Sequence, residues 1–442
     1  MSSAPTCTGK TDNKVKHTIL PSARLQGSIT VPGDKSISHR ALMIGALADG
    51  ISEVHGFLNA ADPRSTRSCL EALGIPISQS GDHLQIHGRG LLGLQAPRRG
   101  LDAGNSGTTM RLLSGILAGQ PFVSVLTGDD SLSTRPMKRI IEPLTGMGAH
   151  IESSPHGTAP LRIEGRFPLD PLEYVMPFPS AQVKSTVLLA GLFAEGETRV
   201  SEPAPTRDHT ERMLNLKASS GTGNTVIRVL GGQRIKPREF VIPGDISSAA
   251  FLIVAALIVP GSEVLLRDIG LNPTRSRILD VLRSVGADME ISNVREFSGE
   301  PMGDVLVRSS LLHGNLALSG RAVAEMIDEI PILAVAGLFL DGKFELHDSS
   351  DLRNKESDRI AAMVSNLRHL GCAVEEYPDG FAFEGGKSLK GGEVKSFHDH
   401  RIAMAFGVAG LALPAGMVVH DAECVDISYP GFWETLSSLQ RS

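Results

Sequence analysis

The sequence predicts an α/β protein of two domains, each built from three β-α-β-α-β-β units. The first observation is that apolar helices ending in glycine recur along the chain. Their closing glycines are Gly50, Gly119, Gly196, Gly261, Gly342 and Gly416, spaced by roughly 65 to 80 residues, which is longer than a solenoid repeat. The second is that a β-rich run and then an amphipathic helix ending in glycine follow most of them, as in residues 278–286.

A duplicated segment sets the expected domain organisation. Residues 31–40 read V-P-G-D-K-S-I-S-H-R, and residues 242–251 read I-P-G-D-I-S-S-A-A-F, aligned without a gap through Gly50 and Gly261. One domain, called the N-lobe below, is therefore expected at 30–240. The other, called the C-lobe, combines 1–29 with 241–442. The chain would then cross between the domains twice, which favours a hinged cleft between two lobes.

Composition narrows the class of protein. The chain has 442 residues, 41% of them hydrophobic and 21% charged, as in globular proteins with substantial cores. Its net charge of -6 argues against a nucleic-acid binder that relies on bulk positive charge. The longest apolar stretch, 249–259, falls short of the roughly 18 residues of a membrane span, so no membrane partner is expected.

The cysteines and the N-terminus indicate a cytoplasmic protein. The four cysteines are far apart and show no metal-binding spacing, which is typical of a reduced chain. Residues 1 to about 16 lack an apolar segment and contain an early Asp, so they are expected to be a loose tail without a targeting signal.

The first helix of the N-lobe begins with groups suited to an anion. Lys35 and Ser36 stand at its start, where free N–H groups and the helix dipole attract phosphate, and Arg40 follows about one turn later. The second copy keeps the hydroxyl as Ser247 but has Ile246 in place of Lys35. Residues found only in the first copy are therefore expected to serve a ligand. The alternative is that Ser36 is only an N-cap and Lys35 a solvated charge.

Further anion-binding candidates lie at later helix starts of the N-lobe. Residues 104–109 (G-N-S-G-T-T) let a ligand approach the backbone, although a plain tight turn is the alternative. Residues 134–139 place three cations around a proline, which also describes a solvated helix face. Residues 179–184 offer a hydroxyl and an amide, and 206–210 offer hydroxyls and one Arg, a combination that suits phosphate.

Carboxylates are the prominent candidates in the C-lobe. Asp328 and Glu329 stand at the start of a strongly apolar segment, where partial burial could tune one of them as a base; interaction with the helix dipole is the alternative. Glu356 and Arg359 are spaced i, i+3, so a surface ion pair is the alternative to a catalytic role for Glu356. Flanking cations would depress the pKa of Glu356 and count against it as an acid unless a bound anion reverses the effect.

The run F-H-D-H-R at 397–401 contains three consecutive His and Asp residues, which are common metal ligands. Adjacent positions of a regular element cannot all face one ion, so no metal is expected there. An anion-binding Arg401 is the preferred interpretation.

Nine ordered motifs, from P-G-D-K-S-I-S-H-R to D-H-R-I-A-M-A over about residues 20–433, resemble the EPSP synthase family. The resemblance implies an inside-out α/β prism of the EPT/RTPC-like type. It implies transfer of the enolpyruvyl group of phosphoenolpyruvate to the 5-hydroxyl of shikimate 3-phosphate, which yields 5-O-(1-carboxyvinyl)-3-phosphoshikimate and phosphate on the path to chorismate and the aromatic amino acids. It also implies a monomer without metal or organic cofactor, and inhibition by glyphosate.

The resemblance also implies roles for particular residues. Asp328 takes the proton of the 5-hydroxyl, Glu356 protonates the methylene carbon, and Lys35 lies between the two substrates. The implied shikimate 3-phosphate site consists of Lys35, Ser36, Arg40, Ser180, Ala181, Gln182, Arg207, Asp328 and Lys355. The implied phosphoenolpyruvate site consists of Lys35, Gly107, Arg135, Gln182, Arg359 and Arg401.

Two departures and two alternatives accompany the resemblance. Ile427 stands where some members of the family have a Lys, and the chain stops soon after Trp433, so the last strand is expected to be short or missing. The related UDP-N-acetylglucosamine enolpyruvyl transferase is disfavoured because its catalytic-loop Cys is absent from T-G-D-D-S-L-S-T-R-P-M. A non-catalytic phosphate-sugar binding protein would not require both Asp328 and Glu356.

Overall fold

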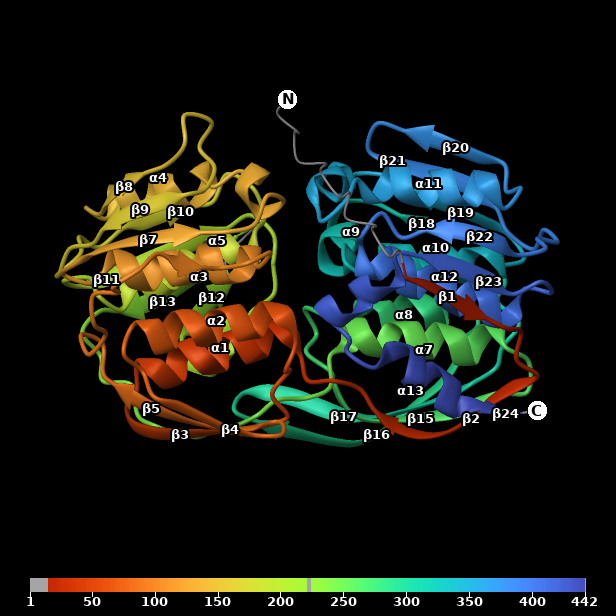
Figure 1. Ribbon diagram of the computed structural model, residues 1–442, viewed down its shortest axis with the longest axis horizontal. Coiled ribbons are helices and arrows are strands. Elements are labelled where there is room, and N and C mark those ends of the chain that lie inside the picture. The colour runs from red at the N-terminus through yellow and green to blue at the C-terminus, as the bar shows by residue number, and fades with distance from the viewer. Residues whose placement is uncertain (1–14, 221–223, 442) are drawn as a thin grey trace, which may run out of the picture.

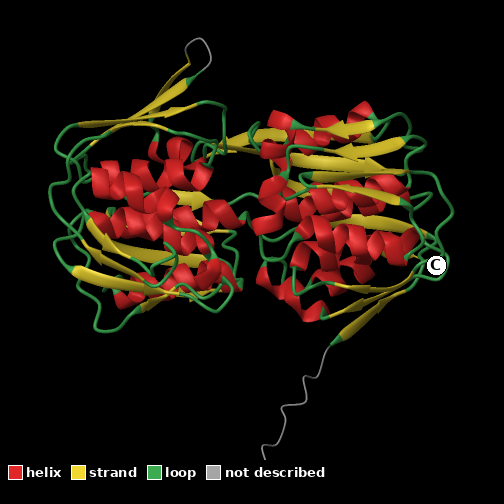
Figure 2. Cartoon of the chain, turned by 90° about the horizontal axis from the view of Figure 1, so that it is seen from above, coloured by secondary structure: helices red, strands yellow, loops and turns green. Residues whose placement is uncertain are grey.

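The computed structural model describes residues 15–220 and 224–441, in which helices are surrounded by small sheets. The tail expected at residues 1 to about 16 lies outside the described residues, apart from its last two. Both views of the molecule show two lobes side by side, each with helices inside and strands on the outer faces (Figures 1 and 2). This arrangement confirms the predicted α/β prism.

The N-lobe contains three four-stranded sheets, in the orders β14-β3-β5-β4, β6-β7-β9-β8 and β10-β11-β13-β12. In each sheet the first pair of strands is parallel and the others are antiparallel. The strands are β3 (Asp49–His55), β4 (Ile77–Ser80), β5 (His83–Arg89), β6 (Leu101–Asp102), β7 (Val123–Thr127), β8 (His150–Glu152), β9 (Leu161–Glu164), β10 (Glu173–Val175), β11 (Glu197–Glu202), β12 (Lys217–Ser220), β13 (Thr225–Leu230) and β14 (Glu239–Val241). The α-helices are α1 (Lys35–Ala46), α2 (Ala61–Ala72), α3 (Gly107–Ala118), α4 (Lys138–Gly146), α5 (Ala181–Gly191) and α6 (His209–Leu214).

The C-lobe contains sheets in the orders β16-β17-β15-β2-β24, β18-β19-β21-β20 and β1-β23-β22. Its strands are β1 (Lys16–Ile19), β2 (Arg24–Thr30), β15 (Glu263–Gly270), β16 (Asp288–Phe297), β17 (Glu300–Arg308), β18 (Leu316–Leu318), β19 (Lys343–Leu346), β20 (Val374–Tyr377), β21 (Gly380–Glu384), β22 (Gly392–Lys395), β23 (Met417–His420) and β24 (Gln440–Arg441). Its α-helices are α7 (Ile246–Ile258), α8 (Arg277–Ser284), α9 (Gly320–Met326), α10 (Ile330–Leu338), α11 (Arg359–His369), α12 (His400–Ala412) and α13 (Phe432–Leu439).

The sixth unit differs from the β-α-β-α-β-β pattern of the others. Its β22 and β23 flank α12, but the antiparallel neighbour of β23 is β1, from the other end of the chain. The segment that follows β23 forms a short 3-10 helix and α13 instead of two further strands. The last strand, β24, is only two residues long and pairs with β2, in line with the short last strand expected.

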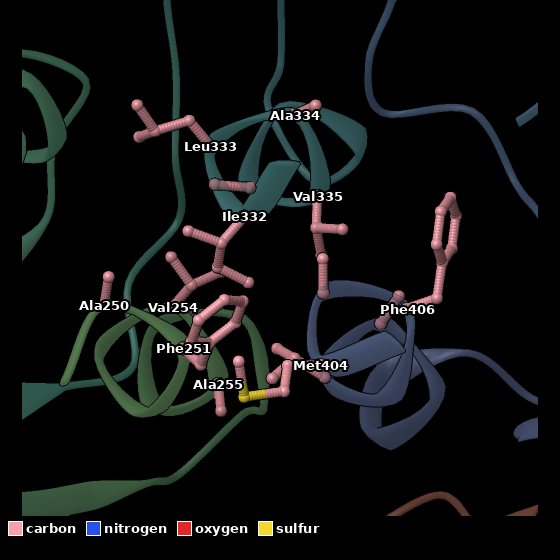
Figure 3. Close-up of a cluster of buried hydrophobic side chains, with 14 of the residues drawn as sticks. Ala250, Phe251, Val254, Ala255, Ile332, Leu333, Ala334, Val335, Met404 and Phe406 are labelled. Atoms are coloured by element: carbon pink, nitrogen blue, oxygen red, sulfur yellow. The ribbon is translucent and has the colours of Figure 1, made fainter. Parts of the chain in front are cut away.

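The apolar core is divided between the lobes. One cluster of buried side chains draws on residues between Ile37 and Ile242, and the other on Ile19, Leu25, Val31 and residues from Ile246 onward. At the centre of the second cluster, α7, α10 and α12 pack against one another through side chains such as Phe251, Ile332 and Met404 (Figure 3). These helices are buried on nearly every side, which explains their almost uninterrupted apolar sequences.

The duplicated segments meet where the chain passes between the lobes. Gly33 and Gly244 form an antiparallel bridge. The backbone N–H of Asp34 donates to Pro243 O at 2.8 Å, and that of Asp245 donates to Pro32 O at 2.9 Å. β2 precedes α1 in sequence but pairs with β15 of the C-lobe, whereas β14 precedes α7 but pairs with β3 of the N-lobe. The exact domain boundaries at 30 and 240 stay a prediction.

Among the residues that the structure describes, no helix is long and apolar enough to cross a membrane.

Candidate active site

The candidate site is built from the first turns of helices, because their capping residues hold the chain in place there. Asp34 caps α1, Ser106 caps α3 and Asp399 caps α12, each by accepting a hydrogen bond from a backbone N–H of the first turn. Lys35, Gly107 and Arg401 are thereby fixed at or next to the first helical position. Several anion-binding candidates consequently lie at the positive ends of helix dipoles.

Asp328 lies in the turn between α9 and α10 and is surrounded by cations. Its carboxylate accepts from Arg207 Nη2 at 2.5 Å and Arg359 Nη1 at 3.2 Å, and it lies 3.6 Å from Lys355 Nζ. Its backbone oxygen accepts from Arg401 Nη1 at 2.9 Å. Burial opposes the charge of Asp328, but these cations outweigh burial and hold its pKa well below the usual range.

The contact between Arg207 and Asp328 joins the two lobes. Arg207 lies just before α6 of the N-lobe, and Asp328 belongs to the C-lobe. Their side chains are only 21% and 16% exposed, so the pair is largely shielded from water. The structure thus brings Arg207, which the resemblance assigns to the substrate phosphate, into direct contact with Asp328, which the resemblance assigns as the base.

Glu356 is the second carboxylate of the site. Arg359 donates to it from Nη2 at 2.7 Å, so the ion pair forms. The expectation of a surface pair was wrong, because the Arg359 side chain is 1% exposed. Burial raises the pKa of Glu356, but Arg359, His400, Lys35 and Arg135 lower it, and the result lies well below the usual range. Glu356 is therefore ionised in this state at neutral pH.

Arg359 is buried and donates to both carboxylates, Asp328 and Glu356. Its side chain is 1% exposed, and its Nε donates to Asp399 at 2.8 Å. Burial disfavours its charge, but Asp399, Glu356 and Asp328 raise its pKa above the ordinary value. One guanidinium thus links three carboxylates and fixes the spacing between Asp328 and Glu356.

Lys35 faces the same group of charges from α1. Its Nζ donates to Asp62 at 3.0 Å. Burial lowers its pKa, but Asp62 and Glu356 outweigh burial and raise it above the usual value. Lys35 is therefore a permanent cation near Glu356.

A second part of the site combines the starts of α3 and α5. Gln182 accepts from Arg111 Nη1 at 2.7 Å and donates to Thr108 Oγ1 at 3.0 Å. A Cβ built on Gly107 would lie 2.8 Å from Arg111 Nη1 and 3.6 Å from Arg135 Nη1. Gln182, Gly107 and Arg135 are thus brought close together.

Arg135 is anchored to the loop before α3. It donates to Asn105 Oδ1 at 2.8 Å and to Ser131 Oγ at 3.3 Å. Its buried Nε has no hydrogen-bond partner among the described residues. Among these residues, the Nε–H of Arg135 is therefore a free hydrogen-bond donor for an anion.

The remaining implied residues are positioned more indirectly. Arg40 is buried, and its N–H groups donate to Ser36 O, Ser185 Oγ and Thr210 Oγ1 at 2.7 to 2.9 Å. Burial lowers its pKa to about 10. Ser180 caps α5 and Ala181 is its first residue. Among the hydrogen bonds and ion pairs of the described residues, none joins Ser36, Arg40, Ser180 or Ala181 to Asp328 or Glu356.

His398, Asp399 and His400 do not form a cluster of metal ligands among the described residues. Asp399 is committed to Arg359 and to the N-terminus of α12, and burial lowers the pKa of His400 to about 4. Ligand atoms of His398, Asp421 and Glu423 do lie within 4.8 Å of one another, but His398 and Glu423 are exposed, and such groups are common without a metal.

Sequence reasoning missed several groups that shape the site. Asp62 pairs with Lys35, Arg111 and Thr108 hold Gln182, and Asp399 anchors Arg359. Thr108 belongs to the glycine-containing segment 104–109 and Arg111 follows it closely, but nothing in that segment indicated Gln182 as their partner. Asp62 carried no signal beyond its position at the start of a helix.

Comparison with known proteins decides the family. The model of the family EPSP synthase (3-phosphoshikimate 1-carboxyvinyltransferase) matches residues 19–436. The chain belongs to the EPSP synthase family.

Individual relatives of this family are similar over nearly their full length. A 3-phosphoshikimate 1-carboxyvinyltransferase of Salinibacter ruber is 50% identical over 429 residues, which cover 96% of this chain and 99% of the relative. A 3-phosphoshikimate 1-carboxyvinyltransferase of Pelobacter propionicus is 50% identical over 424 residues, which cover 96% of this chain and 98% of the relative. The solved structure of EPSP synthase from Acinetobacter baumannii is 42% identical, covers 97% of this chain and 98% of its own, and superposes with a TM-score of 0.87. The predicted family and fold are thus confirmed.

Proposed function

We propose that the site between the lobes transfers the enolpyruvyl group of phosphoenolpyruvate to the 5-hydroxyl of shikimate 3-phosphate and releases phosphate, as expected of an EPSP synthase. The observation that carries the proposal is the pair of partly buried carboxylates, Asp328 and Glu356, joined by Arg359 and surrounded by cations. The two lobes would close on the substrates and exclude water.

Binding follows from charge. Both substrates carry a phosphate and a carboxylate, and the site offers cations from both lobes. For shikimate 3-phosphate we propose Lys35, Ser36, Arg40, Ser180, Ala181, Gln182, Arg207, Asp328 and Lys355. For phosphoenolpyruvate we propose Lys35, Gly107, Arg135, Gln182, Arg359 and Arg401. The unsatisfied Nε of Arg135 supports this assignment, since an anion would complete its hydrogen bonding.

The chemistry requires a base and an acid. In the addition step, the 5-hydroxyl oxygen bonds to C2 of phosphoenolpyruvate, its proton passes to Asp328, and Glu356 gives a proton to C3. In the elimination step, C3 returns a proton to Glu356, the bond from C2 to the phosphate oxygen breaks, and the leaving phosphate takes the proton held by Asp328. Lys35 stabilises negative charge between the substrates. Both carboxylates therefore end in their starting state.

The free protein holds both groups in their ionised form. Cations depress the pKa of Asp328 and make it a weak base until the phosphate of shikimate 3-phosphate engages Arg207. Glu356 likewise has to gain a proton before it acts as an acid, and the negative charge of bound phosphoenolpyruvate would raise its pKa. We thus propose that substrate binding itself switches both groups into their working states.

Three further expectations belong to this proposal. Glyphosate competes with phosphoenolpyruvate, because Gly107 leaves room beside Arg111 and Arg135. The protein works as a monomer, since both lobes of one chain supply the site. It works in the cytoplasm without metal or organic cofactor.

A phosphate-release assay tests the proposal. Shikimate 3-phosphate and phosphoenolpyruvate should release phosphate together and not singly. UDP-N-acetylglucosamine serves as the control acceptor, and release with it instead of shikimate 3-phosphate would assign the chain to the related sugar-nucleotide reaction.

A further inference from the structure

A buried ammonium lies inside the N-lobe, behind the start of α5. The side chain of Lys184 is 0% exposed, and its Nζ lies 2.7 Å from Glu211 Oε1 and 2.9 Å from Glu202 Oε2. It also donates to Thr206 O at 3.3 Å. All three N–H groups of the ammonium therefore have an acceptor within the protein.

This cluster of Lys184, Glu202 and Glu211, called the Lys184 triad below, ties three elements together. Lys184 lies on α5, Glu202 ends β11 and Glu211 belongs to α6. Lys184 lies about one turn after Ser180, the N-cap of α5. It is followed in sequence by Ser185, whose hydroxyl accepts a hydrogen bond from Arg40. The triad thus connects the helix of the proposed phosphate site with the segment that leads into α6.

The segment between β11 and α6, residues 203–208, contains neither helix nor strand. Thr206 within it is held by three hydrogen bonds to the triad. Its N–H and its hydroxyl donate to Glu202 Oε2 at 3.2 and 2.8 Å, and its carbonyl accepts from Lys184. The next residue is Arg207, whose guanidinium reaches Asp328. The backbone that carries Arg207 is consequently anchored through Thr206.

Stability alone is a poor explanation for such a cluster. Removing charges from water costs free energy, and a buried ion pair is often no more stabilising than apolar residues of the same size. Burial raises the pKa of Glu211 despite the neighbouring ammonium, and its Oε2 has no hydrogen-bond partner among the described residues. The triad fits better as a device that fixes geometry.

We propose that Lys184 is a positioning residue for shikimate 3-phosphate, which acts through Thr206 to hold the guanidinium of Arg207 where the substrate phosphate binds. The inference rests on the proposed function and adds a residue that touches neither substrate. Without the triad, residues 203–208 lose their anchor and Arg207 samples several positions. The phosphate then binds less tightly, whereas phosphoenolpyruvate is held by other residues.

Steady-state kinetics of Lys184→Met test the proposal. We expect KM for shikimate 3-phosphate to rise by about tenfold or more, with about a twofold change in KM for phosphoenolpyruvate. In a double-mutant cycle, Lys184→Met should add little to Arg207→Ala, because both changes remove the same interaction. Equal losses for both substrates, or effects that multiply in the double variant, would overturn the proposal.

A milder variant covers the case in which Lys184→Met does not fold. Thr206→Val removes only the hydroxyl bond to Glu202 and should raise KM for shikimate 3-phosphate by about threefold. Thr198→Val is the matched control, since Thr198 is buried on β11, the strand that ends with Glu202, but accepts from the N–H of Leu172 instead. An equal rise of that KM in both valine variants contradicts the proposal. Absence of phosphate release by the wild-type protein would instead count against the proposed function.

Discussion

Arg207 of the N-lobe donates a hydrogen bond of 2.5 Å to Asp328 of the C-lobe, across 121 positions of sequence. Arg207, the proposed ligand of the substrate phosphate, thus partly neutralises the charge of Asp328, the proposed base. Binding of the phosphate would withdraw Arg207 and release the carboxylate. Substrate recognition and activation of the base are then the same event.

Replacement of Asp328 separates these roles. Asp328→Asn should lower kcat by about 10² or more, the usual contribution of a general base, and leave binding of shikimate 3-phosphate within a few-fold. Calorimetric binding and turnover check the split. Asp304→Asn is the control, because Asp304 is at least as shielded from water as Asp328 but bonds to Asn293 and to the backbone of Asp268. Equal losses of binding and turnover in Asp328→Asn would make Asp328 only a binding residue.

The loop at Gly107 determines the response to glyphosate. In Gly107→Ala the new methyl group would lie 2.8 Å from Arg111 Nη1, which holds Gln182. We expect inhibition by glyphosate to weaken by about tenfold or more, with a smaller rise in KM for phosphoenolpyruvate. Inhibition curves at fixed phosphoenolpyruvate check this. If the wild-type protein is indifferent to glyphosate, the interpretation of this loop is wrong.

Proton uptake reports on Glu356. Arg359 and its neighbours keep the pKa of Glu356 well below the usual value of about 4.3 despite burial, so the group is ionised at pH 7 in the free protein. If binding raises the pKa of Glu356 above the working pH, it takes up about one proton, and it takes up less as the pH falls toward the pKa of the free protein.

Calorimetry in buffers of different ionisation enthalpy measures this uptake. Phosphoenolpyruvate is titrated into the Asp328→Asn protein in the presence of shikimate 3-phosphate. This variant is used because its low activity limits turnover during the titration. A second change, Glu356→Gln, should abolish the uptake. Unchanged uptake in the double variant would show that another group accepts the proton.

The crossing of the two duplicated segments limits which residues fit there. A Cβ on Gly33 would overlap the carbonyl oxygen of Gly56. This oxygen is a backbone atom, so it cannot move aside as a flexible side chain could. Gly33→Ala should therefore lower the free energy of unfolding by about 2 to 4 kcal/mol. Gly146→Ala is the control, since its Cβ would meet only Leu172 Cδ1 at 3.8 Å, an ordinary contact. Equal midpoints of thermal unfolding in the two variants would argue against a tightly packed crossing.

The sequence was most informative where local pattern determines structure. Apolar helices followed by glycine and the P-G-D repeat predicted the units. The short separation of Glu356 and Arg359 indicated that they could pair, and they do, although Glu356 lies before α11 and not on a helical turn with Arg359. The repeat also distinguished Lys35 from its apolar counterpart Ile246, which is buried in the C-lobe core.

Contacts between distant segments could not be read from pattern. Pairing of Arg207 with Asp328 depends on how two lobes meet, and the Lys184 triad depends on three elements packing around one ammonium. The last strand was expected to be short or missing and the N-terminal segment to join the C-lobe, but the sequence did not indicate that β1 would pair with β23 of the sixth unit. Sequence periodicity carries no information about such partners.

Turnover in D₂O tests the central claim, that Asp328 and Glu356 drive an addition followed by an elimination. Protonation of C3 by Glu356 creates a methyl group, and its later loss of one proton leaves deuterium in the vinyl methylene of the product. Nuclear magnetic resonance of the product should therefore show deuterium at that carbon for the wild-type protein, and Glu356→Gln should form little product. A product that carries only protium at that carbon would contradict the account, because C3 would never have been protonated.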